Sequence, residues 1–383
     1  MCAVPLTWEE IRTRFSSTEK ETYNLHLGAG YIPHSPLFDF FGRNSVEEDE
    51  KMIRLEKVLL GLIMPIVLVL MGSRSAQAQC IATGFSLDGI NLTAVLINPT
   101  TTVTGPVNGA GCNIGVYYSS GKGKIDQAEI YGANYAGVVV NGDNSQVSVN
   151  ITNSKIHDIG EKPLNGTQHG WAIYYRAFSL TGSATGTISD NTISYYQKGG
   201  IVANGQGTNV VVTDNDVEGQ GPVGYIAQNG IQIGYGADAT VTGNTVTGNS
   251  YTGTIYASAG ILVVGGAFYG ICPDGNDCPY TVGTRIMGNV ETGNDVGIWL
   301  SNAAGDGSAP TTATNIKAVN NTITNDFLTN GSIYQAGVSD EGNNDKIIAN
   351  RISGNGYNPT VYPGEAFTID VSTTNRAKVQ ANK

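Results

Sequence analysis

Apolar and polar positions follow one six-residue pattern that recurs between residues 125 and 352. The pattern is an apolar residue, two small or polar residues, an asparagine, any residue and a second apolar residue. Its clearest copies begin at Ile188, Val212 and Val241. Weaker copies occupy 286–289, 318–323 and 347–352, and copies beginning at Ile125 and Ile151 carry Ala128 and Ser154 in the asparagine position. Repeats of this length determine the architecture, so they are read first.

A second pattern follows each copy: a small residue, then an apolar residue, any residue and another apolar residue. The small residues are Gly137, Ala172, Gly200, Gly230, Gly260, Gly297, Gly337 and Ala366, spaced 28 to 40 residues apart. Runs of Val, Ile and Thr with alternating apolar positions favour strands, and Gly, Asn and Asp clusters between them favour turns. No ten-residue stretch after residue 80 shows a helical period, so crossover helices are not expected.

These patterns predict an all-β, single-domain solenoid of about eight coils, because parallel strands without crossover helices must stack coil on coil around a shared core. We expect the repeated asparagines to align as an internal ladder that hydrogen-bonds one coil to the next. Its members are Asn191, Asn215, Asn244, Asn289, Asn321 and Asn350. In some coils 15 to 18 residues separate the asparagine from the next small residue, against 8 or 9 in others. The longer stretches predict loops at one corner, either as a binding wall or as simple variation in turn length.

Both patterns resemble the repeats of the right-handed parallel β-helix family, a carbohydrate-binding and sugar-hydrolysis class that includes pectate lyases, polygalacturonases, alginate epimerases and phage tailspikes. The resemblance covers about residues 113–370 and implies a right-handed coil and a polysaccharide ligand. It is specific for the fold and not for the function, because the repeat forms the rod rather than the site. Of the polygalacturonase motifs the chain carries His169-Gly170 without its companions, and the arginine motif of many pectate lyases is missing.

The N-terminal region has the features of a secretory signal peptide. A fourteen-residue apolar run at 58–71 follows Met52, Arg54 and Lys57 and precedes Ala76 and Ala78. This order matches a charged segment, an apolar segment and a small-residue cleavage site, and the run is shorter than the ~20 residues that span a bilayer. We expect cleavage after Ala78 and a secreted or periplasmic protein.

The predicted divisions are an upstream segment 1–51, a signal peptide 52–78, an N-terminal cap 79–120, a parallel β-helix 121–370 and a C-terminal tail 371–383. A signal peptide begins at a chain start, so one interpretation is that translation begins at Met52 and 1–51 is not made. The alternative is a cytosolic segment followed by an uncleaved anchor.

Four cysteines lie after the predicted cleavage site, an even number that favours disulfides in an exported protein. Cys272 and Cys278 flank a turn-rich segment, and we expect them to pair. Cys80 and Cys112 then remain to tie the cap to the first coil. A zinc site is the alternative, although the spacing lacks the CxxC pairs typical of structural zinc.

Charge limits the partners. From residue 80 onward there are 13 Lys and Arg against 22 Asp and Glu, a net charge of −9. This excludes the basic footprint of a nucleic-acid binder. It also disfavours a uronate-rich polyanion unless Ca²⁺ bridges the acidic groups. No resident metal or other cofactor is indicated, and no membrane partner is expected once the signal peptide is removed.

One row of residues is predicted to point outward from the strands that follow the small residues. The row is Val139, Tyr174, Val202, Gln232, Leu262, Trp299, Ser339 and Thr368. Tyr174 and Trp299 offer flat rings that can stack on sugars, with Gln232 between them and the acidic pair Asp340 and Glu341 at a strand end. Three interpretations stay open: loops cover the row, the row binds a glycan, or the row forms a subunit interface as in a trimeric tailspike.

The segment 155–176 concentrates reactive side chains: His157, Asp158, Glu161, His169 and Arg176. A lyase can use Arg to remove a proton and His as the acid, whereas a hydrolase needs two carboxylates such as Asp158 and Glu161. The structural alternative is that His157 bonds a turn and Arg176 pairs with Asp158.

The sequence therefore predicts a secreted β-helix that binds, and in one hypothesis cleaves, a polysaccharide as a lyase or glycoside hydrolase. The alternative is a non-catalytic extracellular scaffold, adhesin or trimeric fibre subunit, and a third hypothesis is a periplasmic accessory protein that handles a metal or a partner enzyme. Both a monomer and a homotrimer are compatible with the pattern.

Overall fold

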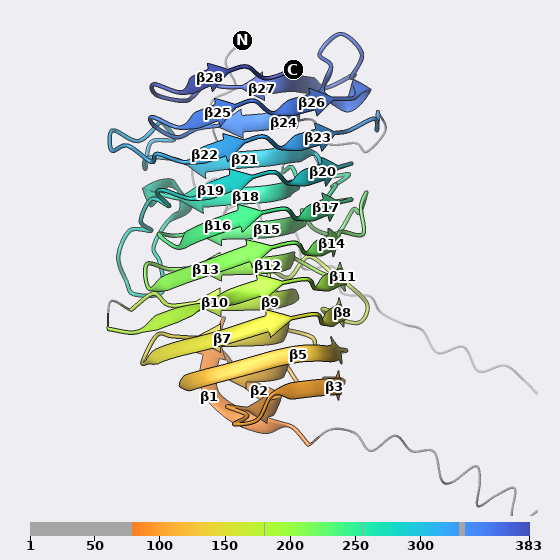
Figure 1. Ribbon diagram of the computed structural model, residues 1–383, viewed down its shortest axis with the longest axis vertical. Helices are drawn as coiled ribbons and strands as arrows, with labels where there is room; N and C mark the ends of the chain where they lie inside the picture. Colours follow the sequence, from red (N-terminus) through yellow and green to blue (C-terminus); the bar gives the residue numbers. More distant parts are fainter. Residues whose placement is uncertain (1–78, 180, 255, 329–333) are drawn as a thin grey trace, which may run out of the picture. The chain divides into compact units, whose positions relative to one another are not determined.

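The computed structural model describes residues 79–179, 181–254, 256–328 and 334–383. The predicted upstream segment 1–51 and signal peptide 52–78 lie outside the described residues. The described chain winds into stacked parallel coils (Figure 1). Within these ranges it forms no α-helix, and its helical turns are η1 (Ala267–Tyr269) and η2 (Asn355–Tyr357).

Each coil places one strand in sheet A, an eleven-stranded sheet in which β1 pairs antiparallel with β2 and the other pairs are parallel. Its strands are β1 (Ile81–Leu87), β2 (Ile90–Ile97), β4 (Ile114–Tyr118), β6 (Ala136–Asn141), β9 (Trp171–Arg176), β12 (Gly199–Asn204), β15 (Asn229–Gly234), β18 (Ala259–Gly265), β21 (Val296–Asn302), β24 (Tyr334–Asp340) and β27 (Glu365–Asp370).

The second sheet has seventeen strands and bends at the asparagine turn into two rows, which we call row B and row C. Row B contains β7 (Gln146–Thr152), β10 (Ser183–Ser189), β13 (Thr208–Thr213), β16 (Asp238–Thr242), β19 (Arg285–Met287), β22 (Lys317–Val319), β25 (Lys346–Ile348) and β28 (Lys378–Gln380). Row C contains β8 (Lys155–Ile159), β11 (Thr192–Tyr196), β14 (Asp216–Glu218), β17 (Thr245–Thr247), β20 (Val290–Thr292), β23 (Thr322–Thr324) and β26 (Arg351–Ser353). β3 (Val103–Asn108) and β5 (Gly121–Tyr131) extend along both rows.

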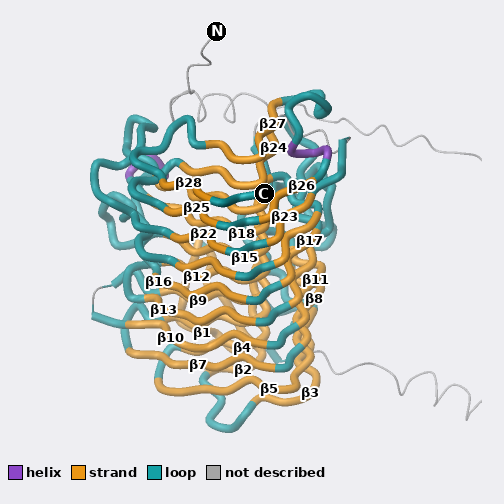
Figure 2. Tube along the Cα trace, turned by 45° about the horizontal axis from the view of Figure 1, so that its top comes forward, coloured by secondary structure: helices purple, strands orange, loops and turns teal. Residues whose placement is uncertain are grey.

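Inward side chains of the three strand rows meet along the axis of the rod. In sheet A the column runs Ile173, Ile201, Ile231, Ile261, Ile298 and Val338, and all six are fully buried. Burying each such side chain contributes about 1.5–3 kcal/mol. Figure 2 shows the strands stacked around this interior, with loops leaving at the corners.

The asparagine ladder links the coils at the corner between rows B and C. Asn191 Nδ2 donates to Oδ1 of Asn215 at 2.9 Å, and the same bond recurs through Asn244, Asn289, Asn321 and Asn350 at 2.9–3.0 Å. Each backbone N–H along this row also donates to the side-chain oxygen of the next coil. The residue before each asparagine has a left-handed backbone, which explains the Asp, Gly or Asn in most copies: Asp190, Asp214, Gly243, Gly288, Asn320 and Ala349.

Several predicted boundaries are wrong because both ends of the described chain join the solenoid. β2, β3 and β4 pair in parallel with later strands, so the coils begin well before residue 121 and only β1 caps the start. β28 pairs with β25 inside the predicted tail, and Asn350 donates to Asn382, a ladder member that the prediction missed. Sheet A has ten strands in parallel pairings, which are the eleven minus β1, rather than about eight.

The predicted position of the last repeat is wrong by two residues. Ala336 lies beside Phe367 and Ser339 beside Asp370. This register places Thr368 in the small-residue column instead of Ala366, and Asp370 in the outward row instead of Thr368. The loop before β27 does not follow the repeat, so the sequence pattern did not show this offset.

The structure confirms both predicted disulfides. Cys80 bonds to Cys112 and Cys272 to Cys278, with Cα–Cα distances of 5.4 and 4.9 Å. The first joins the segment before β1 to the turn before β4. The second closes a short loop after η1.

One core position holds an acid. Glu291 lies in register between Val246 and Ile323 and is fully buried. Its Oε2 accepts a hydrogen bond from Asn294 Nδ2 at 3.0 Å, and its Oε1 has no partner among the described residues. Burial raises the pKa of this carboxyl well above its usual value, because the charged form is poorly solvated there.

Replacing one ladder residue should weaken the whole rod. Asn244→Ala removes an amide that serves both neighbouring coils, leaves the buried backbone N–H of Asn215 without its acceptor and removes one acceptor of the Asn215 side-chain amide. We expect a loss of about 2–4 kcal/mol in the free energy of unfolding, measured by urea denaturation. Exposed Asn209→Ala on β13 is the control and should change it by less than about 0.5 kcal/mol. Equal effects of the two substitutions would contradict the role of the ladder.

Glu291→Gln should stabilise the protein more at high pH than at low pH. The raised pKa means that the folded state retains a proton that the unfolded chain loses above its ordinary value of 4.5. Stability from this group is therefore present below that pH and is lost as pH rises toward the folded pKa. The gain in Tm from Glu291→Gln should be larger at pH 7.5 than at pH 4. Exposed Glu365→Gln is the control, and a gain independent of pH would refute the assignment.

Candidate functional site

The chain turns out of row C at one corner of each coil. In register, the turning residues are Gly132, Asp158, Tyr195, Gly219, Gly248, Gly293, Asn325 and Gly354. Gly132, Gly248, Gly293 and Gly354 have φ between 66° and 107°. Glycine suits this position because it enters the left-handed region without a Cβ clash.

Asp158 and Tyr195 occupy this glycine position on adjacent coils, with φ of 55° and 50°. A left-handed backbone costs an ordinary residue about 1–2 kcal/mol, and such strain gathers at functional positions. The Tyr195 side chain is 61% exposed, which makes it one of the most exposed large apolar side chains of the described rod. Packing does not explain why a tyrosine stands here.

Two cavities meet at Tyr195. The first, of about 220 Å³, is lined by Asp158, Glu161, Lys162, Tyr195 and Gln220, with Gly160, Pro163 and Leu164 completing the wall. The second, of about 280 Å³, is lined by Ser194, Tyr195, Glu218 and Gln220, with Gly219 and Gly221. We call these two cavities together the Tyr195 site. Its walls come from successive coils and from the loops at 160–170 and 219–228.

Buried glutamines hold these loops in place. Gln197 Oε1 accepts hydrogen bonds from the backbone N–H groups of Glu161 (3.1 Å) and Asn165 (3.2 Å), and its Nε2 donates to Thr167 O (2.9 Å). On the next coil, Gln228 Oε1 accepts from Gln220 N at 2.9 Å. Because both glutamines are fully buried, the loops that carry Glu161 and Gln220 are anchored to the rod.

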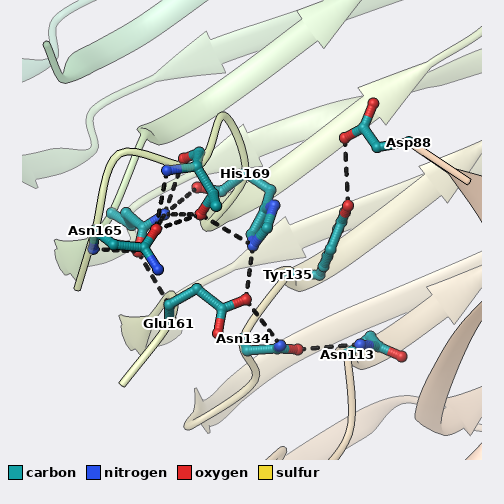
Figure 3. Close-up of polar contacts among 9 residues, drawn as sticks. Asp88, Asn113, Asn134, Tyr135, Glu161, Asn165 and His169 are labelled. Carbon is teal, nitrogen blue, oxygen red and sulfur yellow. Dashed lines mark hydrogen bonds and ion pairs between the residues drawn. The ribbon is translucent and has the colours of Figure 1, made fainter. Parts of the chain in front are cut away.

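Glu161 lies between a histidine and an asparagine (Figure 3). Its Oε1 contacts His169 Nε2 at 2.8 Å and accepts from Asn134 Nδ2 at 3.0 Å. The Tyr135 ring stacks on His169 with centroids 3.8 Å apart, and Tyr135 O–H reaches Asp88 Oδ2 at 3.3 Å. Burial and the Asp88 carboxylate raise the pKa of Tyr135 to about 12. Glu161 and His169, two of the reactive side chains grouped in the segment 155–176, are thus in direct contact.

His157 belongs to a second cluster, separate from the contacts of Glu161 and His169. Its Nδ1 contacts Asp158 Oδ2 at 2.6 Å, its Nε2 contacts Glu129 Oε1 at 3.2 Å, and its ring stacks on Tyr131 at 5.5 Å. Asp158 is the link between this cluster and the Tyr195 site, because it also lines the first cavity. His157 itself is not a lining residue of either cavity.

Arg176 is not part of either cluster. It lies at the far end of β9, is buried, and pairs with Asp143 at 2.8 Å rather than with Asp158. Its guanidinium also lies over the rings of Phe85 (4.7 Å) and Phe178 (5.2 Å). The structure therefore separates Arg176 from the histidines with which the sequence grouped it.

The predicted outward row is covered at its N-terminal end. Tyr174 is 5% exposed and lies in a cluster with Val139, Val202 and residues of β2, and Phe85 and Leu87 of β1 pack against the cluster. The β1–β2 hairpin forms this cover. Tyr174 therefore has no open face for stacking on a sugar, and a strand hairpin, rather than the loops expected in one interpretation, covers the row there.

Further along the row, Gln232 and Trp299 are half-buried. Trp299 Nε1 donates to Glu341 Oε1 at 3.3 Å, and burial raises the pKa of the Glu341 carboxyl. Asp340 is buried; burial, with a smaller contribution from Asp340, raises the pKa of neighbouring Asp345 to about 8. These acids lie in the C-terminal coils and line neither cavity of the Tyr195 site.

Tyr195, Glu218 and Gln220 were missed by the sequence interpretation. A signal was present: the fourth residue after each ladder position is glycine in five of eight copies, and Tyr195 is the aromatic exception. No group of three or more His, Cys, Asp or Glu suited to a metal occurs in the described ranges. The predicted Ca²⁺ bridge remains a prediction. None of the helices in the part of the chain that the structure describes is long and apolar enough to cross a membrane.

Comparisons with known proteins agree with the architecture. Residues 93–278 match the family model described as a right handed beta helix region. This confirms the predicted resemblance and the right-handed parallel β-helix class. No curated protein matches the sequence.

Three solved structures show limited similarity. The Dettilon tailspike protein is 14% identical with a TM-score of 0.39, covering 75% of this chain and 61% of that one. A glycoside hydrolase is 9% identical with a TM-score of 0.37, covering 70% and 38%. A DFA-IIIase from Arthrobacter chlorophenolicus is 13% identical with a TM-score of 0.34, covering 70% and 56%. The chain thus spans about two fifths to three fifths of these structures, and these similarities do not bear on function.

Proposed function

We propose that this protein binds a polysaccharide outside the cytosol, with the Tyr195 site as the contact. The observation that carries the proposal is the exposed Tyr195 ring, held in a left-handed backbone conformation that glycine adopts at four other copies of this position. A ring with an apolar face and a polar edge suits the flat face of a pyranose. The side chains of Glu218, Gln220 and Glu161 around it supply hydrogen-bond acceptors and donors for sugar hydroxyls.

The shape of the site supports a chain-like ligand. Its two cavities share Tyr195 and Gln220, so together they lie along the axis of the rod across neighbouring coils. Parallel coils are spaced about 4.8 Å apart, and sugar units of one chain can therefore contact successive coils. The two disulfides fit an oxidising compartment, which supports a secreted or periplasmic location.

Cleavage of the bound polysaccharide is a second candidate, favoured by one observation. Asp158 and Glu161 line the same cavity, and their side chains are 50% and 29% exposed. Hydrolysis of a glycosidic bond requires two carboxyl groups that flank the bond. The His169 contact and the Asn134 amide orient Glu161 for this role.

The substitution Tyr195→Gly tests the backbone strain at this position and the ligand contact of the ring by two separate measurements. Glycine relieves the left-handed backbone, so the free energy of unfolding should be unchanged or higher by up to about 1 kcal/mol. Loss of the ring should weaken binding about three- to tenfold, measured on a glycan array and then by calorimetry on the best ligand. Tyr256→Ala, which removes another exposed ring, should bind like the parent. The proposal fails if the parent binds no glycan on the array or if Tyr195→Gly binds as well as the parent.

The cleavage candidate predicts that the parent releases new reducing ends from the polysaccharide that it binds. Glu161→Gln and Asp158→Asn should each lower that rate about a hundredfold or more while retaining binding, because they remove an acid or a base from the chemical step. Exposed Asp238→Asn on β16 is the matched control. Binding without any release of reducing ends would support the proposed binding function and contradict the cleavage candidate.

A further inference from the structure

We infer that the Tyr195 site prefers a sugar unit that carries a protonated amine, as in an amino sugar without its acyl group, over neutral and uronate sugars. The inference rests on the proposed polysaccharide binding and adds the chemical class of the ligand. It is carried by the second cavity, where an exposed ring and an unpaired carboxylate line one space.

Glu218 is the carboxylate in question. It is exposed on β14, between Ser194 on the preceding coil and Thr247 on the next. Among the residues that the structure describes, no hydrogen bond or ion pair to its side chain occurs. The small neighbours leave the carboxylate open to solvent and to a ligand.

Tyr195 supplies the second half of a cation site. An ammonium group over the face of an aromatic ring is attracted by the negative charge of that face. The ring and Glu218 line the same cavity, so one ammonium group can contact both. A neutral hydroxyl is attracted less strongly than an ammonium group both by the ring face and by the Glu218 carboxylate.

The charges of the other lining residues also favour a cationic ligand over an anionic one. Among the described residues that line the cavities, the second cavity has no basic side chain, and the first has one, Lys162, against Asp158 and Glu161. Both of these acids contact histidines, whereas Glu218 does not. A uronate placed at the second cavity would bring its carboxylate toward Glu218, and like charges in that position repel.

The expected preference is modest because the site is exposed to solvent. An exposed ion pair and an exposed cation–π contact together correspond to about three- to tenfold in affinity. Salt screens the ionic part, so the preference should shrink at high ionic strength. The stacking contribution of the ring should not change with salt to the same extent.

The test compares three hexasaccharides by isothermal titration calorimetry at pH 6: deacetylated chitosan, its N-acetylated counterpart and oligogalacturonate. The parent protein should bind chitosan about three- to tenfold more tightly than the N-acetylated chain, and oligogalacturonate most weakly. Glu218→Gln should reduce the chitosan preference to the part that the Tyr195 ring supplies and leave the affinity for the N-acetylated chain unchanged. Glu365→Gln removes an exposed carboxylate on β27, away from the site, and should behave like the parent.

Two results separate this inference from the proposed function. Equal or tighter binding of the N-acetylated chain or of oligogalacturonate, still lost in Tyr195→Gly, overturns the amine preference and supports the polysaccharide site. A chitosan preference that is undiminished in Glu218→Gln also overturns the inference, because another acid must then provide the ionic part. Binding of none of the three chains overturns the inference, and the glycan array decides the proposed function.

Discussion

Coil-to-coil register is the constraint on which this structure depends, and the buried asparagine row enforces it. Each ladder amide bonds the coil before and the coil after. Asn215 and Asn244 also bond their own coil. A slip by one residue would turn the inward isoleucines and valines to solvent and would leave the amides buried without partners. Hydrophobic burial stabilises the rod in any register that buries its apolar residues. The hydrogen bonds of the ladder amides form in only one of these registers and therefore select it.

The same constraint builds the Tyr195 site. Asp158, Tyr195 and Glu218 come from three successive coils, and they lie together only because β8, β11 and β14 pair in one register. Gln197 and Gln228 then fix the loops whose residues complete the walls. The rod therefore supports the Tyr195 site, which lies at the corner where tyrosine takes a position that is glycine in five of eight copies. A strained tyrosine is tolerated there because the surrounding ladder and core over-determine the backbone.

Other parts of the rod use similar side chains for stability. The β1–β2 hairpin covers Tyr174 and brings Phe85 over Arg176, so an aromatic ring and an arginine that suggest a ligand site instead close the N-terminal end of sheet A. Asp295 is a fully buried acid that accepts hydrogen bonds from Tyr251 N and Ser258 N and so holds a loop. Residue type alone does not separate these roles from function. Exposure and the presence of a cavity separate them.

The sequence by itself determined the periodic features: the strands, their parallel stacking, the ladder from Asn191 to Asn350 and both disulfides. The strands, the stacking and the ladder follow from local spacing that repeats, so one chain contains several copies of the same evidence, whereas the disulfides follow from the even number of cysteines. Only the tertiary structure decided which outward residues are covered, that Arg176 pairs with Asp143, that the coils extend into the predicted cap and tail, and that Tyr195 and Glu218 share a cavity. These outcomes depend on contacts between segments far apart in the chain and on loops without a period. No repeat in the sequence encodes such contacts.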